Sequence, residues 1–202
     1  MLGLQQQSPM ASPSPDLALA LVSFGGYFAA SHVPDQPAYV VPETALDQLI
    51  PLLPASVFPY LSLYPFLGLN AVYFWPKPAQ ARRVFWAISL LNGLGSMLFC
   101  SVRTTVPRPE PASNRLLAWL WRIDPPYNAL PSLHTAYAVV VAEAHWRLRS
   151  PWRWLVAVWA VAIIISTLTT KQHRLWDVLA GMLLARMVAK RLFANFSAKH
   201  QL

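Results

Sequence analysis

The residues best suited to chemistry are two histidines and an aspartate in the second half of the chain. His173 and Asp177 are four residues apart, so on a helix their side chains share a face, with their Cβ atoms about 5–6 Å apart. The carboxylate can then hold one ring nitrogen and leave the other free as a nucleophile or general base. A second histidine, His134, begins another apolar stretch. Two histidines and a carboxylate with cations nearby indicate phosphoryl transfer.

Three further residues suit the binding of a phosphate. Arg108 lies in Val106-Pro-Arg-Pro109, Ser132 lies two residues before His134, and Lys171 lies two residues before His173. The N-terminus of a helix adds partial positive charge and unpaired N–H groups, both of which favour an anion. We therefore predict a phosphate-binding site made by Arg108, Ser132 and Lys171, beside the two histidines.

The elements that must position these residues are long apolar segments. Of the 202 residues, 55% are hydrophobic and 12% are charged, and an ordinary soluble domain carries roughly twice that charge. Such runs are typical of membrane spans. We predict an all-α, polytopic membrane protein, a bundle of six transmembrane helices. The predicted spans are residues 16–31, 49–75, 84–102, 131–146, 154–168 and 173–193.

The segments outside these spans complete the predicted organisation. Residues 1–15 read as a disordered N-terminal tail, 16–195 as one membrane domain, and 196–202 as a cytoplasmic C-terminal tail. Four prolines near the start of the second span predict a kink or break there. Apolar residues between arginines over residues 113–123 favour a short helix lying in the membrane interface.

Charge in the loops predicts the orientation of the bundle. The turns at residues 76–83 and 147–153 are basic, whereas the loop at 32–48 is acidic. The positive-inside rule then places both termini in the cytoplasm and the loop at 103–129 outside. The first turns of spans four and six, with the candidate residues, fall on the outer face. We expect a multi-pass integral membrane protein that lies in a bacterial inner membrane. The net charge of +8 is explained by these loops, and we expect no nucleic-acid partner.

Three short motifs resemble the signature of a known family, the type 2 phosphatidic acid phosphatase superfamily. They are Arg108-Pro109, Pro131-Ser-Leu-His134 and Ser166-Thr-x5-His173-x3-Asp177. Their order and spacing match over roughly the last hundred residues, and the resemblance implies a core of six spans.

The chain also departs from the family pattern. Ser101 and Thr167 stand where the pattern has a lysine and an arginine, and Lys171 and Arg103 are the candidates to replace these cations. The variant motifs look closer to the branch that includes inositol-phosphorylceramide synthase-like phosphotransferases.

The resemblance implies a role for each matched residue. His173 attacks phosphorus and forms a phosphohistidine, and Asp177 orients it. His134 protonates the leaving oxygen and then activates water or an acceptor hydroxyl. Arg108, Ser132 and Lys171 would stabilise the equatorial oxygens, where charge develops during transfer.

Several functions remain open from the sequence. The leading hypothesis is a membrane phosphatase that hydrolyses a lipid phosphate or diphosphate. The alternatives are a phosphotransferase that moves a phosphoryl headgroup to a lipid hydroxyl, and a non-catalytic membrane scaffold or transporter. A metal site is a rival explanation for two histidines and an aspartate, but the surrounding cations would repel a metal ion. We therefore expect no metal and no cofactor. The sequence names neither the lipid nor an oligomeric state.

Overall fold

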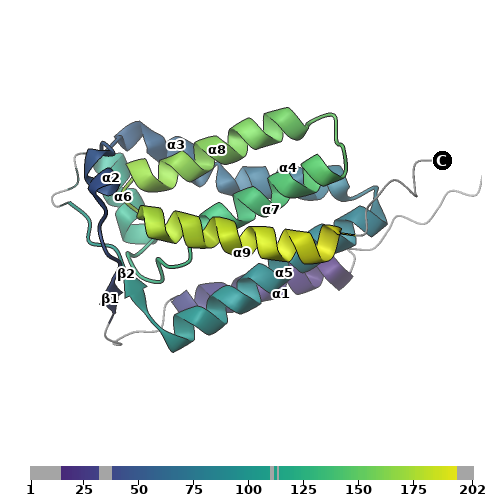
Figure 1. Cartoon of the computed structure of the whole chain (residues 1–202), viewed down its shortest axis with the longest axis horizontal. Coiled ribbons are helices and arrows are strands. Elements are labelled where there is room, and N and C mark those ends of the chain that lie inside the picture. Colours follow the sequence, from purple (N-terminus) through teal and green to yellow (C-terminus); the bar gives the residue numbers. More distant parts are fainter. Residues whose placement is uncertain (1–14, 32–37, 110–111, 113, 195–202) are drawn as a thin grey trace, which may run out of the picture.

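The chain is helical over most of the residues that the computed structural model describes, which are 15–31, 38–109, 112 and 114–194. The predicted tails lie outside this range, apart from Pro15. Long helices run side by side along one axis (Figure 1). They are α1 (Pro15–Ser31), α4 (Leu63–Phe74), α5 (Pro78–Ser101), α7 (Leu133–Arg147), α8 (Arg153–Thr169) and α9 (Leu175–Phe193).

Each of the six apolar segments predicted from the sequence corresponds to one of these helices or to a broken one. The second segment is broken near its start, as expected, into η1 (Pro54–Ser56), α3 (Val57–Leu61) and α4. The break at Ser62 lies between Pro59 and Pro65. Because a proline has no N–H, each of them removes one helical hydrogen bond around this point.

Two helical segments are long and apolar enough to cross a membrane by themselves. They are Pro54–Phe74 and Pro78–Ser101, whereas the apolar stretches in α1 and α8 are shorter. The predicted helical fold is therefore confirmed, but six membrane spans are not, and they stay a prediction. The predicted bounds made α9 begin too early: residues 173 and 174 precede it.

Helix α7 lies at the centre, where it packs against α4, α5, α8 and α9. Its buried residues form a single hydrophobic cluster with those of the surrounding helices. Gly95 of α5 lies so close to Leu133 that an added Cβ would come 2.7 Å from that side chain. The Asn92-Gly-Leu-Gly95 segment thus permits the close helix contact that small residues favour in membrane bundles.

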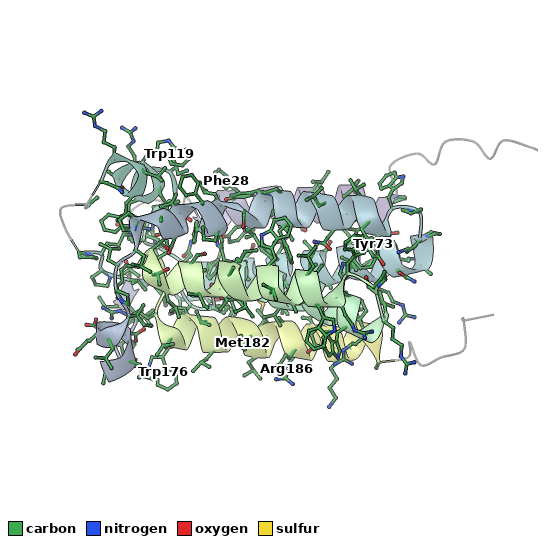
Figure 2. The ribbon with its side chains drawn as sticks, turned by 90° about the horizontal axis from the view of Figure 1, so that it is seen from above. Phe28, Tyr73, Trp119, Trp176, Met182 and Arg186 are labelled. Atoms are coloured by element: carbon green, nitrogen blue, oxygen red, sulfur yellow. The ribbon has the colours of Figure 1, made fainter. Side chains whose placement is uncertain are left out.

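Short elements gather at one end of the bundle (Figure 1). They are β1 (Tyr39–Val40), α2 (Ala45–Leu49), β2 (Thr104–Thr105) and α6 (Arg115–Ile123). Helix α6 confirms the predicted short helix, but the parallel β1–β2 pair was not expected. Figure 2 shows Trp119 and Trp176 at this end and Tyr73 at the other. The loops predicted to lie outside the membrane therefore meet at one end, beside the N-termini of α7 and α9.

Candidate active site

The turn after α8 sets the position of His173. The N–H groups of Lys171 and Gln172 bond to the carbonyls of Leu168 and Thr167, each at 3.1 Å. These two bonds make a Schellman turn, whose left-handed residue is usually glycine. Here it is Lys171, with φ 56°. The N–H of His173 also bonds to Thr167 at 3.1 Å, which delivers its side chain to the end of the bundle.

His173 lies just before α9, which corrects the prediction that it sits in the first turn of that helix. Its Nδ1 is 3.4 Å from Oδ2 of Asp177, which is fully buried. The pair has ion-pair distance without hydrogen-bond alignment, because Nδ1 has no hydrogen-bond partner. Asp177 Oδ2 instead accepts the N–H of Arg174 at 2.8 Å, which caps the start of α9. The carboxylate is thus fixed, and it faces Nδ1 and leaves Nε2 of His173 for chemistry.

His134 is the second residue of α7 and lies in its first turn, as predicted. Its ring stacks on Tyr60 at 4.3 Å between centroids. The ring of His173 lies 6.2 Å away, and the Nε2 of His134 is buried without a hydrogen-bond partner. The two histidines, predicted from separate motifs, are therefore brought together at one end of the bundle.

Ser132 and Gly181 hold the starts of α7 and α9 against each other. Ser132 is fully buried. Its N–H donates to the carbonyl of Asp177 at 3.0 Å, and its Oγ accepts the N–H of Thr135 at 3.3 Å as the helix cap. A Cβ on Gly181 would overlap the carbonyl oxygen of Ser132 and come within 3.2 Å of Thr135. Glycine at 181 is therefore needed for this approach.

Arg108 spans the gap between α6 and the turn before α9. Its guanidinium donates to the carbonyls of Trp121 at 2.8 Å and Asp124 at 2.6 Å, and also to the Oε1 of Gln172. Its Nε is buried without a partner. Burial lowers the pKa of Arg108, and the negative charge of Asp124 acts in the opposite direction. A guanidinium stays protonated in proteins, so a fixed positive charge lies beside the turn that carries His173.

Lys171 and Arg174 add two further cations. Lys171 Nζ donates to the carbonyls of Asp47 at 3.0 Å and Ile50 at 2.6 Å. Arg174 lies 3.7 Å from the carboxylate of Glu43 and donates to the carbonyl of Val41. The sequence interpretation missed Arg174, although a cation directly after His173 was a visible signal.

Arg103 and Thr167, the other two residues considered for the missing cations, do not belong to this group of cations. Arg103, a candidate replacement cation, lies over the ring of Tyr127 at 4.0 Å and does not line the cavity that holds the other cations. Thr167, which stands where the family pattern has an arginine, is fully buried and its carbonyl serves the turn before His173.

Two cavities flank the histidines. The first, here called the cationic cavity, has a volume of about 470 Å³. Its polar lining consists of Glu43, Asp47, Gln48, Arg108, Lys171, His173 and Arg174. The second, here called the aromatic cavity, has a volume of about 160 Å³. It is lined by His134 and Asp124 together with Phe24, Tyr27, Phe28, Tyr60, Tyr64, Tyr127, Tyr137 and five aliphatic residues or prolines. No residue lines both, so His173 faces one cavity and His134 the other.

Seven buried side-chain atoms without a hydrogen-bond partner were found in the described chain, and all lie at this end. They belong to Arg108, Asn128, His134, Thr135, Gln172, His173 and Asp177. Buried polar atoms are normally paired, and three of these residues, Arg108, His134 and His173, each line one of the two cavities. Within the described ranges, no group of three or more histidine, cysteine and acidic side chains is arranged to hold a metal ion.

Comparison with protein-family models identifies the family of this chain. The model of the PAP2 superfamily matches residues 43–190. The chain belongs to the PAP2 superfamily. The matched range contains all the candidate site residues, and the membership supports a phosphatase- or phosphotransferase-type function.

Other comparisons add a relative without a known role. An uncharacterized protein of Methanocaldococcus jannaschii is 33% identical over 151 residues. These residues cover 71% of this chain and 63% of the relative, so the match spans less than two thirds of the relative's length. No solved structure matches the chain significantly. The PAP2 membership is therefore carried by the family model and by the motifs.

Proposed function

We propose that this protein is an integral membrane phosphatase that hydrolyses a lipid phosphate or diphosphate through a phosphohistidine intermediate. The observation that carries the proposal is the pairing of two histidines, with ring centroids 6.2 Å apart, beside a cavity that holds three cations. Only one of the histidines has a carboxylate at ion-pair distance, which is Asp177 beside His173. This asymmetry suits a nucleophile and a separate acid/base.

The first half of the reaction forms the intermediate. The negative charge of Asp177, 3.4 Å from Nδ1 of His173, favours a proton on that nitrogen, so the lone pair on Nε2 attacks phosphorus. The bond from phosphorus to the lipid oxygen breaks, and its electron pair goes to that oxygen, which takes a proton from His134. Arg108, with Arg174 and Lys171 nearby, stabilises the charge on the phosphoryl oxygens.

The second half returns the enzyme to its starting state. A water molecule gives a proton to His134 as its oxygen attacks phosphorus. The bond between Nε2 and phosphorus breaks, and its electron pair returns to His173 as inorganic phosphate leaves. In this reaction the buried N–H of Ser132 holds the helix ends together. Ser132 lines neither cavity, so its predicted contact with a phosphoryl oxygen stays a prediction.

The bundle end that holds the site is proposed to face the outside of the membrane, with both termini in the cytoplasm. The support is the charge of the loops: the turns at the opposite end, residues 76–83 and 147–153, carry lysine and arginine. Helix α5, which is long enough to span a bilayer, leads from that basic end toward the site.

The test is phosphate release from a panel of lipid phosphates by the purified protein in detergent, with chelator present. Wild type should release phosphate, and His173→Asn should lose at least about a thousandfold in rate, as loss of a nucleophile does elsewhere. Activity that the chelator abolishes and zinc restores would favour a metal-dependent mechanism. Phosphate release that survives in His173→Asn would overturn the proposal. No phosphate release from wild type, together with a cellular function that His173→Asn leaves intact, would support a non-catalytic scaffold or transporter.

A second candidate is a phosphotransferase of the inositol-phosphorylceramide synthase type. The observation that favours it is the composition of the cationic cavity, which also contains Glu43 and Asp47. Carboxylates repel a phosphate but accept hydrogen bonds from the hydroxyls of a polyol headgroup. With ceramide or diacylglycerol present, transfer would yield a new phospholipid, whereas hydrolysis would yield free phosphate.

A further inference from the structure

His134 lies in surroundings that oppose its protonated form. It lines the aromatic cavity, its ring is stacked on Tyr60, and the ring of His173 lies 6.2 Å away. Low polarity disfavours an imidazolium ion. Yet the proposed reaction needs His134 to carry a proton when the lipid oxygen leaves. A nearby negative charge is required to keep it there.

Asp124 supplies a negative charge on the required side. It follows the last residue of α6 and lines the aromatic cavity together with His134. The other residues that line this cavity are aromatic, aliphatic, proline or histidine, so Asp124 is its acidic side chain. Asp177, in contrast, serves His173 and does not line this cavity. Asp177 thus lies at ion-pair distance from His173, whereas Asp124 shares a cavity with His134.

Tyr60 links Asp124 to His134. Its hydroxyl donates to the Oδ2 of Asp124, while its ring stacks on the imidazole at 4.3 Å. Tyr60 is buried, with 1% of its surface exposed. The backbone carbonyl of Asp124 meanwhile accepts a hydrogen bond from Arg108 at 2.6 Å. One residue at the end of α6 thus contacts both the phosphate-binding cation and the support of the second histidine.

We propose that Asp124, held by Tyr60, is a positioning residue that keeps His134 protonated and oriented for the departure of the lipid oxygen. The proposal rests on the function proposed above. The titratable groups that line the cavity with His134 or lie against its ring are Asp124, Tyr60, Tyr27, Tyr64, Tyr127, Tyr137 and His173. Among them Asp124 is the carboxylate, so removal of its charge leaves a protonated His134 without a negative group in its cavity.

A structural role for Asp124 makes a different prediction. The Tyr60–Asp124 hydrogen bond joins α3 to α6, and its loss alone would lower thermal stability without changing how the rate depends on pH. Asp124→Asn keeps an oxygen that can accept the tyrosine proton and removes the charge. Tyr60→Phe keeps the charge and the stacked ring and removes the hydrogen bond. The two variants therefore separate charge from structure.

The experiment is the rate of phosphoenzyme formation, measured by rapid quench with a lipid phosphate across a range of pH. In wild type this rate should fall at high pH, where His134 loses its proton. In Asp124→Asn the fall should move to lower pH by about one unit, the size expected for removal of a nearby opposite charge. In Tyr60→Phe it should stay close to the wild-type position. A fall that does not move in Asp124→Asn overturns the proposal.

A second substrate separates this proposal from the proposed function. With p-nitrophenyl phosphate, whose leaving group departs without a proton, Asp124→Asn should form phosphoenzyme at the wild-type rate. A defect of equal size with both substrates would show that Asp124 acts through the fold. If wild type forms no phosphoenzyme with any substrate, the phosphatase mechanism fails. If wild type forms phosphoenzyme and Asp124→Asn has the same pH dependence with the lipid, only the proposed role of Asp124 fails.

Discussion

At one end of the bundle, His145 is hydrogen-bonded through both ring nitrogens, to Asn70 at 2.6 Å and to Ser150 at 2.9 Å. At the other end, His134 and His173 each have a buried ring nitrogen without a partner. Both ends use a Schellman turn, with Arg149 or Lys171 at the left-handed residue. The turn after α7 brings Ser150 to His145, and the turn after α8 brings His173 toward His134.

The difference between the ends lies in what the turns leave unpaired. Around His145 the polar groups bond to one another, as buried groups do when they serve stability. Around His134 and His173 several buried polar atoms have no hydrogen-bond partner, and each of the two histidines lines a cavity. His145 thus has both ring nitrogens hydrogen-bonded, whereas His134 and His173 each keep a buried ring nitrogen without a hydrogen-bond partner, as the proposed active site requires.

Substitution of one histidine at each end should have the largest effects and should separate a role in turnover from a role in stability. His134→Asn should lower turnover about 10²–10⁴-fold, the usual contribution of an acid/base, and should leave thermal stability close to wild type. His145→Asn should retain turnover per folded molecule but lower the free energy of unfolding by about 1–3 kcal/mol, because buried partners lose their bonds. Turnover and thermal unfolding in detergent measure both. Equal losses of turnover would contradict the comparison.

Glycine substitutions should show that the close packing of α7 on α9 positions the candidate catalytic residues. In Gly181→Ala the new methyl group meets the Ser132 carbonyl, and such overpacking costs about 1–3 kcal/mol. Turnover should fall as well, because the helix starts that carry His134 and Asp177 are pushed apart. Gly93→Ala is the matched control, since an added Cβ there meets nothing within 4 Å. Its thermal midpoint should stay level or rise, and a drop as large as that of Gly181→Ala would count against the explanation.

The smallest expected effect concerns Asp47, which ties α2 to the start of α9. Its carboxylate accepts from the backbone N–H groups of Thr44 at 2.8 Å and Leu175 at 2.9 Å. Burial raises the pKa of Asp47, but these hydrogen bonds and the Thr44 hydroxyl outweigh it, so the pKa lies below its ordinary value.

The stability that Asp47 contributes should therefore be present above its unfolded-state pKa of about 3.9 and be lost as pH falls through the lower folded-state value. Near neutral pH, Asp47→Asn should lower the free energy of unfolding by about 1.5 kcal/mol. The gap between variant and wild type should narrow as the pH is lowered below about 4. Thermal unfolding at several pH values measures it, and a gap that widens in acid would refute this linkage.

Much of this structure follows from local signals in the sequence. Apolar runs indicated the six long helical segments, the prolines near 59 and 65 indicated the break before α4, and the motif spacing indicated His134, His173 and Asp177. These features depend on residues close together in the chain, so a periodicity or a spacing reveals them.

What the sequence did not reveal depends on contacts between distant segments. The β1–β2 pair joins residues 39–40 to 104–105, and Tyr60 reaches Asp124 across 64 positions. The position of His173 outside α9 depends on a turn whose left-handed residue is a lysine, where glycine would have been the visible sign. The partners of Arg174, Glu43 and Val41, also lie far from it in the chain.

The most direct test of the central claim is the chemical identity of the phosphorylated residue. The protein would be mixed with a lipid phosphate that carries a labelled phosphoryl group, quenched within one turnover and digested at alkaline pH. The account predicts a phosphoryl group that is stable to alkali, released by acid, located on the peptide that contains His173, and absent from His173→Asn. Phosphate release from an enzyme that never carries the label, or a label on any other residue, would contradict it.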